Sequence, residues 1–134
     1  MTPHEKYRKF VEEEVARIQE ELNLQNWRIN IHHVKYIKPY EHIPSKGGYT
    51  AEVEADHVYL EADVFLSKKA EAKYHESPAY FLQDLYHELI HILIDPIANF
   101  AEQRVPKKDR TELLNLEERL TQVLSIVIHK LSRK

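Results

Sequence analysis

The chain has 134 residues, of which 43% are apolar and 31% are charged, and this predicts one globular domain, residues 1–134. The net charge of −3 predicts no nucleic-acid partner and no membrane association, and the lack of cysteine excludes disulfides and thiolate metal ligands. The first residues contain no apolar signal segment, and no apolar run is long enough to span a bilayer, so we expect a cytoplasmic protein.

The first predicted element in the chain is a helix. Thr2 and Glu5 form a capping-box pattern around Pro3, and apolar residues then recur every three or four positions to about Asn23. Three segments follow in which apolar and polar residues alternate, as they do in half-buried strands. The predicted strands are residues 27–32, 49–55 and 58–66.

Turn signals separate these strands from one another and from the helices that follow. Prolines and a pair of glycines predict a loop at residues 38–48, and a hairpin turn is expected just after Asp56. Ser77 and Pro78 are the predicted N-cap and first residue of a second helix, which we expect to end soon after Pro96.

The last predicted element is a third helix. A polar stretch at residues 99–108 leads to a capping box that begins at Asp109, and the helix is expected to run to about Leu131. The order of one helix, three strands and two helices predicts an α+β domain.

The second predicted helix contains an HExxH pattern at His87, Glu88 and His91. Residues four apart share one helix face, so the two imidazoles can converge on one tetrahedral Zn²⁺. Glu88 would then reach a zinc-bound water, whose pKa zinc lowers to about 7, and act as the general base in attack on a carbonyl. Because the chain has 9 histidines, the pattern alone could arise by chance. Its position inside a helix with an apolar stripe is what favours a zinc site.

A catalytic zinc requires a third protein ligand and an open position. The metzincin spacing is excluded because Ile94 and Ile97 occupy the positions of its glycine and third histidine, and Asp95 comes too early for an aspartate ligand. A glutamate of the third helix remains, either Glu117 or Glu118, and periodicity leaves this choice open.

The two glutamates lie on different faces of the predicted third helix. Glu117 flanks the main apolar stripe, formed by Leu113, Leu116, Leu120, Val123, Leu124 and Val127. Glu118 lies on a second face, with Leu114 and the small residues Thr121 and Ser125, which would permit close approach to another helix.

Residues 87–93 (HELIHIL) and 118–125 (ERLTQVLS) resemble the ImmA/IrrE-type metallopeptidases, which are short gluzincin-like proteins. The family pattern of Glu, three residues, a polar amide and then a large–small pair fits when its glutamate is placed on Glu118 and its amide on Gln122. The resemblance therefore implies Glu118 as the third ligand, with Glu117 as the alternative. The chain departs from the family at Ile90, where members often have glycine.

The same resemblance implies a minimal zincin-like fold, in which a small twisted three-stranded sheet packs on the HExxH helix between N-terminal and C-terminal helices. A protein or peptide substrate would add as an extended strand at the sheet edge, for which residues 58–66 or 49–55 are the candidates. The implied activity is zinc-dependent hydrolysis of peptide bonds. The alternatives are a zinc-binding regulatory module that acts through contacts with a regulatory protein, and a chain that binds no metal.

Several other polar residues are candidates for supporting roles at the predicted site. Asp84 or Gln122 could accept a hydrogen bond from the second ring nitrogen of a ligand histidine, although a solvated carboxylate near the helix N-terminus is the favoured interpretation of Asp84. Trp27 is expected to pack in the core or at an interface. The candidate oxyanion donors are Tyr86, His75, Arg104 and Arg119. The histidines expected to be ordinary surface residues are His32, His33, His42 and His57.

Overall fold

The structure is a computed structural model that describes residues 1–41 and 43–132. Within these residues four α-helices, a 3-10 helix and a three-stranded mixed sheet form an α+β fold, which confirms the predicted class. The elements in chain order are α1 (Pro3–Glu21), β1 (Arg28–His33), β2 (Ala51–Asp56), β3 (Glu61–Leu66), α2 (Lys68–Glu76), α3 (Pro78–Glu102), the 3-10 helix η1 (Lys107–Asp109) and α4 (Arg110–Ser132). Among the described residues no helix is both long and apolar enough to cross a membrane.

Helix α1 begins at the predicted capping box and supplies one side of the core. The Thr2 hydroxyl accepts the Glu5 backbone N–H at 3.1 Å, and the Glu5 carboxylate accepts the Thr2 backbone N–H at 3.3 Å. The apolar stripe of α1 packs against α3, the helix that carries the HExxH pattern. The buried side chains of this contact are Tyr7, Val11, Val15 and Ile18 from α1 and Phe81, Leu82, Leu85 and Leu89 from α3.

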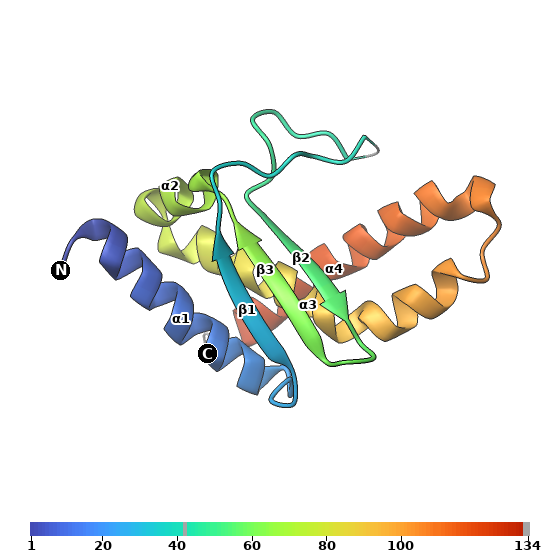
Figure 1. Cartoon of the computed structure of the whole chain (residues 1–134), viewed down its shortest axis with the longest axis horizontal. Helices are drawn as coiled ribbons and strands as arrows, with labels where there is room; N and C mark the ends of the chain where they lie inside the picture. The colour runs from blue at the N-terminus through green and yellow to red at the C-terminus, as the bar shows by residue number, and fades with distance from the viewer. Residues whose placement is uncertain (42, 133–134) are drawn as a thin grey trace.

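The sheet has the strand order β1-β3-β2, in which β1 pairs parallel to β3 and β2 pairs antiparallel to it. Every second side chain of β3 is buried, as expected of its central place. Residues 58–66 were one candidate for the free edge, and this prediction is wrong because β3 hydrogen-bonds to a strand on each side. The other candidate, β2, is an outer strand, and it lies beside α3 (Figure 1). The predicted hairpin joins β2 to β3.

One helix was not predicted, and another is longer than predicted. Helix α2 follows β3 where no element was predicted, and its only buried residue is Ala70, so it has no apolar stripe that would have indicated it. Helix α3 continues through Pro96 to Glu102, although an end soon after Pro96 was predicted. A proline removes one backbone donor from the helix ladder. The ladder nevertheless continues beyond it, and the backbone N–H of Gln103 still donates to the carbonyl of Asn99 at 3.2 Å.

Helix α4 packs on α3 through its small and polar face, while its main apolar stripe faces outward. Thr121 and Ser125 are fully buried against α3. Because these side chains are short, the two helix backbones can approach closely. The residues of the main stripe that remain exposed are Leu116, Leu120, Val123 and Val127. Figure 1 shows α3 and α4 lying behind the sheet and extending together past the β2 edge.

The loop at residues 34–50 folds back above β2 and α4 (Figure 1) and depends on a glycine to do so. Gly48 has a φ of +87°, and a Cβ atom at this position would lie 2.5 Å from the Tyr36 ring and 2.7 Å from the Ile37 carbonyl oxygen. The next residue, Tyr49, donates its backbone N–H to that same carbonyl at 3.0 Å. The tight approach of these two loop segments therefore requires a residue without a side chain. His42, which belongs to this loop, lies outside the described residues.

Candidate metal centre

Three potential metal ligands from two helices meet at the contact between α3 and α4. His87 and His91 lie one turn apart on α3, and their Nε2 atoms are 3.2 Å apart. Glu118 of α4 places one carboxylate oxygen 3.2 Å from Nε2 of His87 and the other 2.8 Å from Nε2 of His91. All three donor atoms lie within 4.8 Å of one another, so this cluster could hold a metal ion.

The spacing of the cluster fits a small tetrahedral ion. Metal–nitrogen bonds of about 2.0–2.1 Å place neighbouring ligand atoms of a tetrahedral zinc site about 3.3–3.4 Å apart. The separations of 2.8–3.2 Å between His87, His91 and Glu118 are only a few tenths of an ångström shorter. Small outward movements of these side chains would therefore admit an ion, and three protein donors leave the fourth tetrahedral position open.

The two candidate glutamates of α4 occupy different sides of the same imidazole. Glu118 contacts Nε2 of both histidines, whereas the Glu117 carboxylate lies 3.5 Å from Nδ1 of His91. A ring nitrogen on the far side of an imidazole is where an outer partner orients the ligand. The structure thus brings Glu118 to the ligand position and Glu117 to a position where it can accept the Nδ1 proton of His91.

Gln122 orients the other histidine in the same way. Its side-chain oxygen accepts a hydrogen bond from Nδ1 of His87 at 2.8 Å, which leaves the Nε2 lone pair of that ring free to bind a metal. Asp84, the other candidate for this role, forms an ion pair with Lys73 of α2 at 2.7 Å. The favoured interpretation of Asp84 as a solvated carboxylate was therefore incomplete, since this side chain connects α3 to α2 and also lines the cavity.

The close contacts between carboxylates and imidazoles shift the pKa values of both the histidines and Glu118. Burial alone would lower the pKa of His91, but its contacts with Glu117 and Glu118 raise that pKa to about 10. The pKa of His87 is also raised, with burial opposing the effect of Glu118. Burial works to raise the pKa of Glu118, yet the two imidazoles hold it well below its usual range. At neutral pH the metal-free cluster thus pairs the Glu118 carboxylate with a protonated His91, and a metal ion would replace that proton.

Glu88 lies next to this cluster with its side chain almost entirely enclosed. It is 9% exposed, and its burial raises its pKa to about 7, while the two imidazoles act in the opposite direction. A carboxylate with a pKa near neutrality can both accept and release a proton at physiological pH. Glu88 lines the same cavity as the three clustered residues, so it is placed to exchange protons with a molecule bound there.

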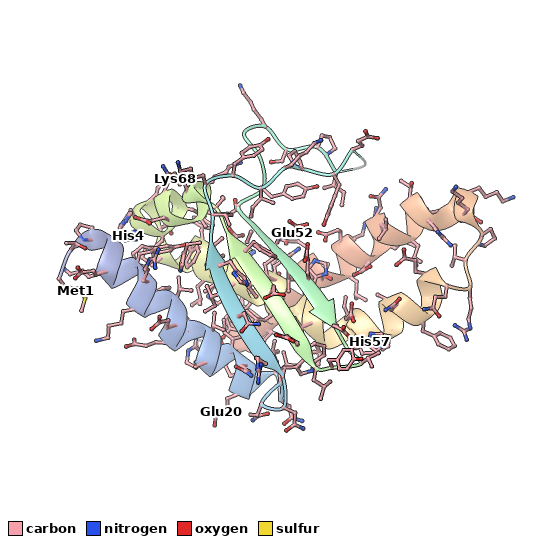
Figure 2. All side chains as sticks on the ribbon, viewed as in Figure 1. Met1, His4, Glu20, Glu52, His57 and Lys68 are labelled. Carbon is pink, nitrogen blue, oxygen red and sulfur yellow. The ribbon has the colours of Figure 1, made fainter. Side chains whose placement is uncertain are left out.

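The cavity in front of the cluster has a volume of about 620 Å³ and lies between α3, α4, the outer strand β2 and the loop at residues 34–50. Figure 2 labels Glu52, which lies near the start of β2 and lines the cavity, and His57, which directly follows the end of that strand. Tyr40 of the loop donates its hydroxyl hydrogen bond to the Glu52 carboxylate, and Tyr40 N–H donates to the Tyr49 hydroxyl at 3.0 Å. The loop is thus tied to the strand whose free edge faces the cavity.

None of the four candidate oxyanion donors is among the described residues that line this cavity. Tyr86 is buried and donates to Glu21 of α1 at 2.6 Å, so it serves to connect helices. His75 lies on α2, 3.4 Å from Glu71, and Arg104 lies beyond α3 with its guanidinium over the Phe100 ring. The hydroxyl-bearing residues that line the cavity are instead Tyr40, Ser45, Tyr49 and Thr50. Sequence reasoning missed them because the loop has no periodicity that would place its residues.

The other predicted surface residues have varied environments. His32 is exposed and lies 2.7 Å from Asp63. His33 is half-buried against the Tyr7 ring, and burial lowers its pKa. His57 is also half-buried and lies 3.1 Å from Asp95 of α3. His32 thus has the expected surface position, whereas His33 and His57 are half-buried, and none of the three belongs to the cluster of potential metal ligands found among the described residues. Trp27, as expected, packs at the margin of the core.

Comparisons with known proteins add nothing to this geometry. Neither a protein-family model, nor a curated protein, nor a solved structure matches the chain. The functional inference therefore rests on the residues themselves and on the way in which the fold brings them together.

Proposed function

We propose that this chain is a zinc-dependent metallopeptidase with a minimal zincin-like fold. One observation supports this most strongly: the His87, His91 and Glu118 donors converge at the wall of a cavity in which Glu88 is also buried. Two imidazoles and one carboxylate, with a fourth position left open, form a donor set that favours zinc and is typical of zinc peptidases. The resemblance of residues 87–93 and 118–125 to ImmA/IrrE-type metallopeptidases supports the same proposal.

The proposed reaction assigns one task to each residue. Zinc held by the three donors would supply a Lewis acid that makes water acidic enough to lose a proton near neutral pH. Glu88 accepts that proton as the water attacks the carbonyl carbon of the scissile peptide. It then returns the proton to the leaving amine as the carbon–nitrogen bond breaks. The pKa of about 7 produced by burial suits Glu88 to both transfers.

The proposed substrate is a protein or peptide segment in extended conformation. Within the part of the chain that the structure describes, strand β2 pairs only with β3, and its residues from Ala51 to Val53 line the cavity. An added strand would hydrogen-bond along the free edge of β2 and pass in front of His87 and His91. The loop at residues 34–50 borders this path on one side, where Tyr40 and Tyr49 line the cavity.

The test combines metal analysis with cleavage of a peptide library. We expect one zinc ion per chain in both the wild type and Glu88→Gln, and cleavage by the wild type alone. Loss of a general base lowers the rate by about 100-fold to 10,000-fold. Glu102→Gln is the matched control, because Glu102 lies on the same helix and is exposed. Full zinc occupancy without any Glu88-dependent cleavage would refute the peptidase and favour the regulatory zinc module.

A further inference from the structure

The outward face of α4 is an apolar stripe that the rest of the described chain leaves uncovered. Its five large residues are between 47% and 61% exposed, although each would be expected in a core. They are Leu116, Leu120, Val123, Val127 and Leu131. Residues of the opposite face, including Glu118 and Thr121, point toward α3 and the candidate metal centre. A continuous exposed apolar surface of this kind marks a contact site for another macromolecule.

The spacing of the stripe is that of a helix that pairs with another helix. Leu113, Leu116, Leu120, Val123 and Val127 follow one another at intervals of three and four residues, which is the a/d pattern of two heptads. Such a pattern needs a partner helix with the same spacing. A second copy of α4 provides it, and two identical surfaces can close by a two-fold axis.

An antiparallel pairing places each of the four residues in the middle of the stripe against an apolar residue of the second copy. When the two-fold axis passes between residues 121 and 122, Leu116 faces Val127 of the second copy, and Leu120 faces Val123. The same two layers repeat on the other side of the axis by symmetry. Each layer then combines one leucine with one valine, which fills the interface evenly along its length.

The charges at the ends of the stripe favour the same orientation. Glu112 and Lys130 are both exposed, and neither has an ion pair within residues 1–41 and 43–132. In the antiparallel pairing Glu112 of one copy is one residue away from the position that faces Lys130 of the other, so that two ion pairs can form. In a parallel pairing Glu112 would face Glu112 of the second copy and Lys130 would face Lys130, and these like charges would repel each other.

From these features we propose that α4 is a dimerisation surface, on which the occupant is α4 of a second copy in antiparallel orientation. The metal centre lies on the opposite face of the same helix, so each copy keeps its own complete site. Dimerisation would therefore hold in place the helix that contributes Glu118 and Gln122. This inference does not depend on the proposed peptidase activity.

The first experiment measures association of the full chain by sedimentation velocity, from micromolar concentrations to hundreds of micromolar, with and without zinc. We expect a reversible dimer in the wild type. The double variant Leu120→Glu, Val123→Glu should raise the dimer dissociation constant at least about tenfold. Val58→Glu is the control, because Val58 is an exposed apolar residue of the β2–β3 turn. A wild type that stays monomeric at every concentration would overturn the proposal and assign the stripe to a different partner.

The second experiment tests the orientation of the two helices by disulfide cross-linking. The chain has no cysteine of its own that could form other disulfides. A mixture of Leu116→Cys and Val127→Cys proteins should form a disulfide-linked heterodimer on mild oxidation, whereas neither protein should cross-link efficiently alone. Efficient cross-linking of Leu116→Cys with itself would show a parallel pair and contradict the proposal. Glu112→Lys should weaken the dimer by a few-fold, and adding Lys130→Glu should restore it. Circular dichroism would verify that each variant remains folded.

Discussion

The Gln122 side-chain oxygen accepts a hydrogen bond from Nδ1 of His87 at 2.8 Å, across the contact between α4 and α3. This bond fixes both the tautomer and the ring plane of His87, because a ring whose Nδ1 carries the proton presents its lone pair at Nε2. Nε2 of His87 faces His91 and Glu118. The amide of Gln122 thus orients a candidate metal ligand without being one of the three clustered donors.

We expect Gln122→Ala to retain the metal site but to weaken zinc binding by about 10-fold to 100-fold, as loss of an orienting partner does. Competition with a fluorescent zinc chelator measures this change. Asn115→Ala is the matched control, because Asn115 is an exposed amide of the same helix. Equal affinities for the two variants would show that the hydrogen bond does not orient His87.

The two adjacent glutamates of α4 should differ in their effect on metal content. Glu118→Gln removes a charged donor that lies within 3.2 Å of both imidazoles, and we expect the purified protein to lose most of its zinc. Glu117→Gln removes only a partner on the Nδ1 side of His91, and we expect it to keep zinc with an affinity lowered by roughly tenfold. Elemental analysis after dialysis measures both. The opposite ranking would identify Glu117 as the ligand.

The HExxH residues could be identified from sequence, because their mutual position is set by a single helix. The third donor could be narrowed only to Glu117 or Glu118, because the choice depends on how α4 is rotated against α3. The buried Thr121 and Ser125 set this rotation, whereas apolar periodicity left the choice open, and most of the main apolar stripe is in fact exposed. The edge position of β2 was equally undetermined, because it follows from the non-local parallel pairing of β1 with β3.

Zinc binding should release protons and strengthen as pH rises. In the metal-free protein the pKa of His91 is raised to about 10, so at neutral pH this imidazole carries a proton that zinc must displace. The pKa of Glu118 is lowered, so its carboxylate is already ionised and contributes no proton. Between about pH 6 and 8 the affinity should therefore rise about tenfold per pH unit for each proton released.

Isothermal titration calorimetry in buffers that differ in ionisation enthalpy counts these protons directly. We expect at least one proton per zinc at neutral pH. A heat of binding that is the same in all buffers would contradict the protonated state of His91, and it would do so without any assumption about catalysis.

The two neighbouring glycines of the loop at residues 34–50 offer a matched pair of substitutions. Both have positive φ, +79° at Gly47 and +87° at Gly48, so alanine is strained at either position by about 1 kcal/mol. A Cβ at Gly47 has no neighbour within 4 Å, whereas at Gly48 it would lie 2.7 Å from the Ile37 carbonyl oxygen. Gly48→Ala must therefore also push apart the loop segments that hold Tyr49 over the cavity.

We expect chemical denaturation to show that the free energy of unfolding falls by about 2–3 kcal/mol for Gly48→Ala and by about 1 kcal/mol for Gly47→Ala. Since the same loop borders the proposed substrate path, only Gly48→Ala should also raise KM for a cleaved peptide. Equal losses of stability for the two variants would mean that backbone strain alone, and not the close approach to Ile37, makes glycine necessary at position 48.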